Sequence, residues 1–359
     1  MKSSPVPNLR KIAKAARVSH TTVSMALHNH PRISARTKQR IAELAQKMGY
    51  RPNALVSALM SHVRSNRHIV SQEPIAFLTS GPTADWWRDV PIFLNNFHGA
   101  TARAEQLGFR LQPFWMGPYG RHAAAVAKVL RARAIRGAVL APLPGLDDGD
   151  IPFDWEHFAI TTIGYSFRQV PVHRAAHHHM HSMLALYKTL RELRYRRIGL
   201  AMTLDNMVRV KYNWLAGLLT GRELYGGNRV PYLTFDLITG KKNFLAWYRA
   251  NRPDVIVGIG KDTYFWLKEA GIRIPQDVGY AHLDLYGALS DENVSGIQQQ
   301  STEIGAAATD LLVSQLYHNE YGAPKNPSCM LIEGYWEPGV TAPGAPNAVA
   351  KRSKSAQKE

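Results

Sequence analysis

The sequence LRKIAKAARVSHTTVSMAL occupies residues 9–27 and predicts two short amphipathic helices joined by a tight turn. Ser19 stands at the expected N-cap of the second helix, where its hydroxyl can accept from backbone N–H groups of the next turn. The apolar positions form one inward face: Ile12, Ala13, Ala16, Val18, Val23 and Leu27. The outward face carries side chains that can reach base edges: His20, Thr21, Thr22, Ser24, Met25 and His28. This pattern is typical of a helix-turn-helix and indicates DNA binding.

The positive charge of the chain is concentrated around this segment. The whole chain has 44 Lys and Arg against 27 Asp and Glu, which gives a formal net charge of +17. Residues 1–72 hold 13 of these basic side chains and a single acid, Glu43, and so account for +12. Basic charge beside a helix-turn-helix favours phosphate contacts with release of counterions. A merely solvated basic face explains the basic tail but not this uneven distribution.

Length and composition favour a multidomain globular protein of the cytoplasm. The 359 residues, 45% of them hydrophobic, are enough for a small head and a large core. The N-terminus lacks the apolar stretch of a signal peptide, and no apolar run approaches the roughly 20 residues that cross a bilayer. Cys329 is the only cysteine, which excludes an intrachain disulfide and a cysteine metal cage. We therefore expect cytoplasmic localisation and no membrane partner.

A third helix and a short hinge are expected after the helix-turn-helix. Ser34 is the predicted N-cap of the third helix, whose apolar residues recur at helical spacing up to Gly49. Pro52 breaks this helix, and Asn53 can cap a short apolar one. We expect a head over residues 1–52, a hinge helix and linker over 53–72, and a disordered tail over 341–359.

From Pro74 onward, short apolar runs alternate with amphipathic helices. The predicted strands are residues 74–80, 109–116, 138–142, 159–164, 197–202, 232–237, 254–259 and 278–283, and one predicted helix covers residues 207–224. Such alternation predicts parallel sheets covered by helices, and two series predict a two-lobed core over residues 73–340. We expect lobe 1 at about 73–165 and 297–330, lobe 2 at about 166–296 and 331–340, and a ligand cleft between them.

The chain resembles the LacI/GalR family of bacterial transcription regulators. The head carries the family pattern in one ungapped register: Ile12-Ala13, Val18-Ser19, Thr22-Val23-Ser24, Ile33-Ser34, Thr37, Ala45, Gly49-Tyr50, Pro52-Asn53 and Leu59. Weaker landmarks follow in the core, among them Tyr195-Arg196-Arg197-Ile198, Pro275-Gln276-Asp277-Val278 and Ile297-Gln298-Gln299. The resemblance implies an α/β fold class with an all-α helix-turn-helix head and a two-lobed periplasmic-binding-protein-like core. It also implies a homodimeric repressor under allosteric control by a small effector.

The same resemblance assigns DNA contacts on a pseudo-palindromic double-stranded operator. It implies base contacts in the major groove from His20, Thr21 and Met25, flanked by Ser19, Thr22, Ser24 and His28. It implies backbone contacts from Arg32, Ser34, Thr37 and Tyr50. Asn53 begins the implied hinge helix. Leu59 matches a leucine that enters the minor groove, where an apolar side chain can unstack a base step.

Two head residues depart from the family pattern. Arg17 stands where glycine is usual, and a positive φ there costs a non-glycine residue about 1–2 kcal/mol. Met25 stands where many members carry arginine. Methionine cannot make a bidentate contact to guanine but can pack on a thymine methyl group. We therefore expect a half-site that differs at this base pair from the half-sites of arginine-bearing members.

The core departs from the family at the effector site. Trp214 occupies the position of the family's effector-binding arginine, for which Arg209 or Lys211 can substitute. Tryptophan stacks on a sugar ring, and carboxylates accept hydrogen bonds from ring hydroxyls. We expect a carbohydrate effector, with a negatively charged saccharide among the options. The candidate contacts are Trp86, Trp87, Phe93, Trp214, Lys261, Asp262 and Asp284. Phe93 and Phe97 share one helix face, which favours core packing for both.

Two other motifs resemble binding sites, one for phosphate and one for a metal. The stretch Gly258-Ile259-Gly260-Lys261-Asp262-Thr263 fails the P-loop pattern, because Asp follows Lys and Val255 replaces the first Gly. Five histidines cluster at His173, His177, His178, His179 and His181. Spacings of four residues on a helix can chelate a metal, but no acid or thiolate stands close by. We expect solvated or effector-contacting histidines, no metal and no cofactor.

No catalytic motif stands out, and we expect no enzyme. The acids Asp205, Asp262 and Asp284 are explained by binding. Two alternatives remain open: a solute-binding or sugar-processing protein with the same core, and an architectural DNA-bending protein without an effector. The basic head argues against the first alternative. A complete lack of stabilisation by sugars would favour the second.

Overall fold

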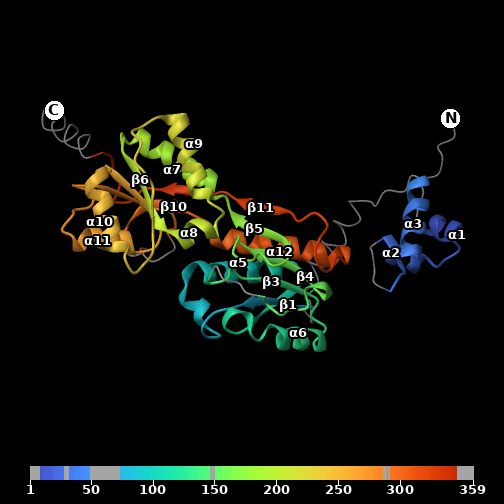
Figure 1. The fold of residues 1–359 in the computed structure, drawn as a ribbon. Helices are drawn as coiled ribbons and strands as arrows, with labels where there is room; N and C mark the ends of the chain where they lie inside the picture. The colour runs from blue at the N-terminus through green and yellow to red at the C-terminus, as the bar shows by residue number, and fades with distance from the viewer. Residues whose placement is uncertain are drawn as a thin grey trace, which may run out of the picture.

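A three-helix head and a two-lobed α/β core make up the computed structural model of this chain (Figure 1). It describes residues 9–27, 32–48, 73–145, 150–285, 289 and 292–345. The predicted fold class is confirmed, because each lobe of the core is built on its own largely parallel sheet. Within these residues, no helix combines the length and apolarity needed to cross a bilayer.

The head contains three helices: α1 (Leu9–Ala16), α2 (His20–Leu27) and α3 (Ala35–Lys47). Each contributes one fully buried side chain to a shared apolar cluster, namely Ile12, Val23 and Ile41. Ser34 is the N-cap of α3, as predicted, and its Oγ accepts from the backbone N–H of Thr37 at 3.3 Å. Helices this short depend on mutual packing, so the small cluster holds the head together.

The first lobe is built on a six-stranded sheet in the order β11-β5-β4-β3-β1-β2, with parallel pairing throughout. The strands are β1 (Glu73–Thr79), β2 (Phe109–Trp115), β3 (Gly137–Leu140), β4 (Ala159–Ile163), β5 (His173–His177) and β11 (Cys329–Ile332). The helices are η1 (Trp86–Asp89), α5 (Pro91–Gln106), η2 (Pro118–Gly120), α6 (Ala123–Ala132), η3 (Trp155–His157) and α12 (Ser301–His318). The inner strands are apolar runs because helices cover both faces of the sheet.

The second lobe repeats this plan with the order β12-β10-β9-β8-β6-β7. Its strands are β6 (Ile198–Thr203), β7 (Leu233–Phe235), β8 (Val255–Gly258), β9 (Gly279–His282), β10 (Ser295–Gln298) and β12 (Tyr335–Glu337). Its helices are α7 (His179–Glu192), α8 (Leu204–Arg209), α9 (Asn213–Tyr225), α10 (Gly240–Asn251) and α11 (Asp262–Glu269). The edge strand β12 pairs antiparallel with β10, unlike any strand of the first sheet.

The predicted lobe boundaries need correction. Strand β5 pairs with β4, so the first lobe extends past residue 165. Strand β10 pairs with β9, so the second lobe extends to Gln298. Strand β11 returns to the first sheet beside β5 and ends at Ile332. These boundaries depend on which distant strands pair, and a pattern of apolar runs does not encode that pairing.

Two further expectations about the chain path are wrong. The helix predicted over residues 207–224 is two helices, α8 and α9, because Lys211 and Tyr212 adopt left-handed φ angles of 53° and 60° between them. The disordered tail predicted from residue 341 begins too early. Thr341 is buried against β9, where its Oγ1 donates to the carbonyl oxygen of Tyr280 at 2.7 Å. The hinge and linker predicted over residues 53–72 lie outside the described residues.

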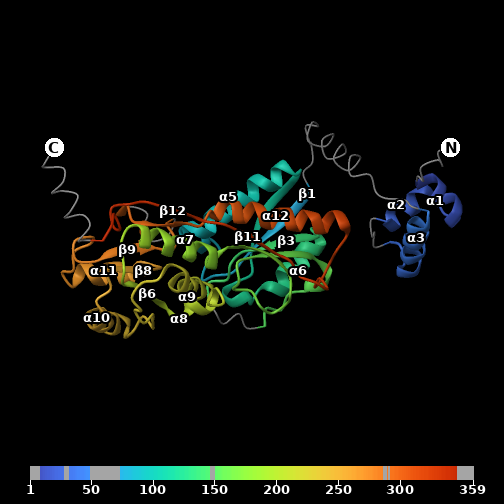
Figure 2. The same cartoon turned by 90° about the horizontal axis from the view of Figure 1, so that it is seen from above.

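Helices α5 and α12 lie side by side on the first lobe (Figures 1 and 2). Two glycines allow their backbones to touch. A Cβ atom on Gly305 would lie 2.0 Å from the carbonyl oxygen of Asn96, and one on Gly99 would lie 1.8 Å from that of Thr302. Any larger residue at either position would therefore push the helices apart.

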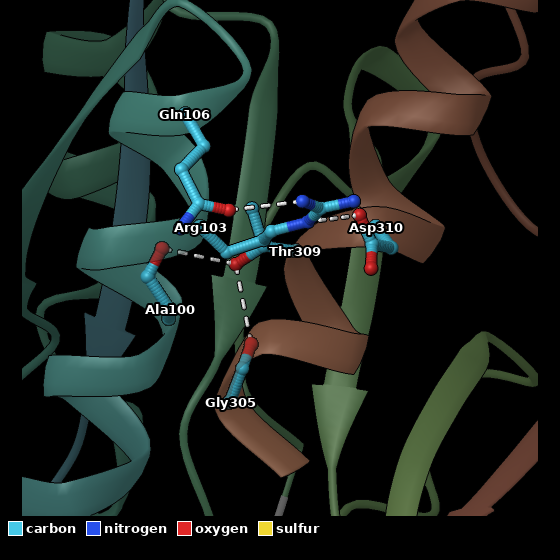
Figure 3. Close-up of polar contacts among 6 residues, drawn as sticks. All are labelled: Ala100, Arg103, Gln106, Gly305, Thr309 and Asp310. Atoms are coloured by element: carbon cyan, nitrogen blue, oxygen red, sulfur yellow. Dashed lines mark hydrogen bonds and ion pairs between the residues drawn. The ribbon is translucent and has the colours of Figure 1, made fainter. Parts of the chain in front are cut away.

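Polar contacts fix the register of the same helix pair (Figure 3). The Arg103 guanidinium donates from Nε to Asp310 Oδ1 at 2.6 Å, and Thr309 Oγ1 donates to the carbonyl oxygen of Ala100 at 3.3 Å. Because α5 also carries Phe93 and Asn96, this packing places one side of the cleft described below.

Candidate functional site

Helix α2 presents the predicted recognition residues of the head. Ser19 precedes it, and its Oγ accepts from the backbone N–H of Thr22 at 3.0 Å, so the predicted N-cap is confirmed. Thr21 is exposed and Met25 is half-buried. His20 and Ser24 also lie on α2. A short helix with an exposed polar side is the geometry that enters a major groove.

The other predicted DNA contacts are divided between the third helix and undescribed positions. Arg32 is exposed, Ser34 caps α3, and Thr37 lies half-buried in its first turn. The hydroxyls of Ser34 and Thr37 lie 2.9 Å apart. Four candidates lie outside the described residues: His28, Tyr50, Asn53 and Leu59.

The turn between α1 and α2 keeps its left-handed residue despite the missing glycine. Arg17 has a φ of 53°, the positive value considered from the sequence. The backbone N–H of Val18 donates to the Ala13 carbonyl oxygen at 3.1 Å and closes the end of α1. The left-handed backbone at Arg17 therefore destabilises the head by about 1–2 kcal/mol relative to a glycine at this position.

A cavity of about 340 Å³ lies between the two lobes, at the carboxyl ends of their strands. Its lining residues directly follow or end strands of both sheets: Tyr165 after β4, His177 in β5, Asn206 after β6, Gly260 after β8, His282 in β9 and Gln299 after β10. Helix α5 adds Phe93 and Asn96 from the first lobe, and α9 adds Trp214 from the second. This is the position predicted for a ligand cleft.

The structure brings four of the seven predicted effector residues to this cavity. Trp86, Phe93, Trp214 and Asp284 line it. Of the two proposed substitutes for the family arginine, Arg209 lines the cavity and Lys211 does not. Lys211 instead places its ammonium 5.7 Å from the centre of the Tyr165 ring, outside the cavity.

Trp87, Lys261 and Asp262 do not line the cavity, which corrects the prediction for these three. Trp87 is 2% exposed, packs 4.8 Å from the ring of Phe97 and donates from Nε1 to the Ala84 carbonyl oxygen. It belongs to the core because the one-turn helix η1 turns adjacent side chains to different sides. Lys261 precedes α11 and Asp262 begins it, beyond the loop that borders the cavity.

Three buried rings form one side of the cavity, which we call the ring cluster: His177, His179 and Trp214. The ring centres lie 5.0 Å apart for the two histidines, 4.8 Å for His179 and Trp214, and 5.6 Å for His177 and Trp214. Within the described residues, both ring nitrogens of His177, Nδ1 of His179 and Nε1 of Trp214 have no hydrogen-bond partner. Buried polar atoms are normally paired, so these four atoms are candidates for contact with a ligand.

Burial also sets the charge of the ring cluster. It lowers the pKa of His177 to about 4 and the pKa of His179 well below its ordinary value. The neighbouring histidines His178 and His181 lower the pKa of His177 further by repulsion. Both imidazole rings of the ring cluster are therefore neutral at pH 7.

The far end of the cavity is held by bonds to the backbone. His282 donates from Nε2 to the Gly260 carbonyl oxygen at 3.1 Å, and its Nδ1 accepts from the Asp284 backbone N–H at 3.1 Å. Gln299 donates to the Leu283 carbonyl oxygen at 2.7 Å. These bonds hold residues 282–284 in place and keep the buried Asp284 in the cavity lining.

Arg209 connects the lobes across the cavity. It extends from α8 of the second lobe and donates to the carbonyl oxygens of Leu143 and Pro144, which follow β3 of the first lobe. Its guanidinium thus belongs to both the cavity lining and the junction between lobes. A ligand that competes for this group would change how the lobes are joined.

The histidine spacing considered for a metal is not helical. His173 and His177 stand at the two ends of β5, which separates them by about 13 Å. His173 is engaged elsewhere, since its Nδ1 accepts from the Ser328 backbone N–H at 3.0 Å. No group of three or more His, Cys, Asp or Glu gathers around a possible metal position in the part of the chain that the structure describes.

Sequence reasoning missed several cavity residues, among them Asn96, Tyr165, Asn206 and Gln299. Three of these follow the end of a strand, and the rule that ligands bind at such ends supplies the missing signal. Asn96 carries no such signal. It reaches the cavity because α5 packs closely on α12.

Two family models match this chain in separate parts. The model "Bacterial regulatory proteins, lacI family" matches residues 8–53, which cover the head. The model "Periplasmic binding protein-like domain" matches residues 187–334, which cover most of the second lobe and part of the first. The two models thus describe the two kinds of domain seen in the structure.

Similar curated proteins match over short stretches. The probable HTH-type transcriptional repressor ExuR of Bacillus subtilis (strain 168) is 51% identical over 51 residues, which cover 14% of this chain and 15% of ExuR. The HTH-type transcriptional regulator DegA of the same organism is 34% identical over 105 residues, covering 28% and 26%. The alignments therefore span less than a third of either relative.

Solved structures resemble the chain over nearly its whole length. The transcriptional regulator CelR in its cellobiose complex has a TM-score of 0.59 and 18% identity, covering 94% of this chain and all of CelR. The lac repressor dimer bound to operator and the anti-inducer ONPF has a TM-score of 0.56 and 16% identity, covering 94% and 99%. At these identities the likeness concerns the fold. Taken with the two matched models, it shows a lacI-type head and a periplasmic-binding-protein-like core in one chain.

Proposed function

We propose that this protein is a sequence-specific transcription repressor of the cytoplasm, controlled by a small carbohydrate effector bound between its lobes. One observation carries the proposal: a capped helix α2 in the head and an interlobe cavity with unpaired polar atoms in its lining residues occur in one chain. The names of ExuR and DegA support the regulatory part. The cellobiose and ribose complexes of two structural relatives support a sugar in the cleft.

Two heads of a homodimer would bind the two halves of a pseudo-palindromic operator. Thr21 and Met25 would contact base edges together with His20, while Ser19, Thr22 and Ser24 contact the flanks. Arg32, Ser34 and Thr37 would contact phosphates, as would Tyr50. Ser19 and Ser34 can do so only while also capping their helices, since their hydroxyls accept backbone N–H groups. Met25 would pack on a thymine methyl group.

Control by the effector would act through the angle between the lobes. A ligand in the cavity touches both lobes and competes with the carbonyl contacts of Arg209. The hinge predicted over residues 53–72, with Asn53 at its start and Leu59 inserted in the minor groove, would pair with its dimer mate only at one lobe angle. DNA and effector would then bias the same two-state element, which is the requirement for allostery.

The test uses the full-length protein and operators selected from random DNA. We expect a palindromic site with an A·T pair opposite Met25, and an affinity that falls steeply as salt rises. Met25→Ala should lose most discrimination at that one base pair, whereas Gln46→Ala, exposed on α3, should change nothing. Selection that recovers no common site, or the same affinity for every sequence, would contradict the proposal.

A truncation tests the coupling between the domains. A fragment that ends after Gln72 should bind the selected operator weakly, because it lacks the core that pairs two heads. A thermal-shift screen of sugars on the full chain should find stabilisation, and the stabilising sugar should alter operator affinity. A fragment with full specific affinity would refute the coupling.

A further inference from the structure

We propose that the effector is a sugar acid, a hydroxylated ring whose carboxylate lies against the ring cluster of His177, His179 and Trp214. The inference rests on the proposed function, because it names the chemical class of the ligand for the same cavity. Three features of the cavity support it: the polarity of its unpaired atoms, the sign of the charge around it, and the position of its acceptors.

The ring cluster offers hydrogen-bond donors to a ligand. The indole N–H of Trp214 can only donate, and each neutral histidine carries one N–H as well. Trp214 is 0% exposed, His177 3% and His179 8%, so the lining side chains must shift for a ligand to reach these unpaired atoms. Three neighbouring donors call for a group with several acceptor positions. A carboxylate, with two oxygens and about four lone pairs, is such a group.

The charges near this end of the cavity favour an anion. Arg209 lines the cavity, and two further cations lie around Tyr165, which also lines it. The guanidinium carbon of Arg174 lies 5.5 Å from the centre of the Tyr165 ring, and the ammonium of Lys211 lies 5.7 Å from it. Among the described lining residues, Asp284 is the one carboxylate. The two cations beside Tyr165 therefore favour an anion at this part of the cavity.

The acceptors of the cavity favour hydroxyl groups on the rest of the ligand. Asn96 is 1% exposed, and its Oδ1 has no partner in the part of the chain described. Asp284 supplies carboxylate oxygens at the end of the cavity where β9 stops. Trp86 and Phe93, whose ring centres lie 5.4 Å apart, offer apolar surface to a ring face. A ring with hydroxyls and one carboxylate meets all of these groups.

Binding of a carboxylate would draw a proton into the cavity. Without ligand, His177 is neutral because burial disfavours its charged form. The groups facing it are His178, His179 and His181 together with Trp214. Of the acids, the exposed Glu333 lies 3.7 Å from His181, and Asp284 lines the same cavity as His177. A ligand carboxylate beside the ring stabilises imidazolium, so a proton passes from solvent to His177 as the complex forms. Affinity then rises as pH falls, until free His177 itself is protonated.

Matched ligand pairs test the proposal on the full-length protein. D-glucuronate is compared with D-glucose, D-galacturonate with D-galactose, and benzoate serves as an acid without hydroxyls. Thermal shift and calorimetry are run from pH 5.5 to 7.5, in buffers of different ionisation enthalpy. We expect stabilisation by a uronate and none by its neutral partner. We also expect uptake of up to one proton and up to a tenfold gain in affinity per pH unit lost.

Variants assign the effect to the ring cluster. His177→Gln should remove proton uptake and the pH slope while uronate binding persists more weakly. Trp214→Phe should weaken uronate binding about tenfold and keep the pH slope. His157→Gln, at a histidine exposed on the first lobe, should change neither property. A pH slope that survives in His177→Gln would overturn the assignment to this ring.

The remaining outcomes separate this inference from the proposed function. Equal binding of neutral sugars without proton uptake, or no stabilisation by either uronate, would overturn the sugar-acid inference. Binding of benzoate but of neither uronate would overturn the inference that the ligand is a hydroxylated ring. In all three cases a selected operator bound by the full chain would leave the regulatory function standing. Failure to bind any specific DNA would refute that function even if a uronate bound.

Discussion

The head and the cleft are built in opposite ways. The head takes its buried cluster and its recognition helix from one stretch, residues 9–48. The cleft collects single side chains from η1, α5, the ends of strands in both sheets, and α9. A curated relative reaches 51% identity over 51 residues, whereas the two solved structures named above are 16% and 18% identical over 94% of the chain. Local construction leaves a clear sequence pattern, and a cavity assembled from distant segments does not.

The largest expected effect is a loss of stability in the core alone. Gly305→Val would drive its side chain into the backbone of α5, 2.0 Å from the Asn96 carbonyl oxygen. We expect a loss of more than about 4 kcal/mol in the unfolding free energy of the core, and loss of effector binding. Circular dichroism during heating would measure it. Glu303→Ala, at an exposed site of the same helix, is the control. An unchanged melting temperature would contradict the close helix contact.

A second substitution should destabilise the head alone. Ile41 is fully buried in the head cluster, and Ile41→Ala should cost about 3 kcal/mol, enough to unfold so small a unit. Operator binding should disappear while the melting of the core and its effector binding stay as they were. Gln46→Ala, exposed on the same helix, should leave both regions intact. If Ile41→Ala also lowered the melting temperature of the core, the two regions would not be independent.

The third prediction concerns acid stability of the core. His177 has a pKa of about 4 in the folded protein and an ordinary value near 6.5 when unfolded. The unfolded state therefore binds more protons between these values, and stability falls as pH drops from about 6.5 to 4. The slope contributed by this ring is about 1.4 kcal/mol per pH unit at most. Urea unfolding at several pH values would show it, with a shallower slope in His177→Gln.

The smallest effect concerns the turn of the head. Arg17 holds a φ of 53°, which glycine adopts without strain. Arg17→Gly should therefore stabilise the head by about 1 kcal/mol. Lys14→Gly, inside α1, should destabilise it by a similar amount, because glycine is a poor helix former. Thermal unfolding of a head fragment would compare the two. The two changes in the stability of the head must have opposite signs. A loss of stability in both variants would show that Arg17 makes a stabilising contact that outweighs its strain.

Sequence reasoning succeeded where structure follows from near neighbours. The Ser19 and Ser34 caps and the positive φ at Arg17 appear in the structure as expected. The eight predicted strands are also present, because apolar runs between helices need no further information. Strand β5 was not predicted, because its polar residues do not form an apolar run. The helix predicted over residues 207–224 is divided at Tyr212, whose backbone is left-handed.

The sequence did not decide which of two adjacent tryptophans lines the cavity. Trp86 and Trp87 have the same chemistry and neighbouring positions, yet Trp86 lines the cavity and Trp87 packs on Phe97 in the core. Only the path of η1 separates them. The histidines behave likewise: His177 and His179 enter the cavity, while His173 bonds the backbone of Ser328.

By itself the sequence determined the three-helix head, the alternation of strands and helices, and the resemblance to a known family. These features arise from helix caps, apolar periodicity and charge within short windows. Tertiary structure alone decided which strands form each lobe and which side chains share the cavity. It also decided that two histidines and a tryptophan stand buried and unpaired together. The reason is physical: burial and the charge state it imposes depend on what distant segments bring near a group, and no local pattern records that.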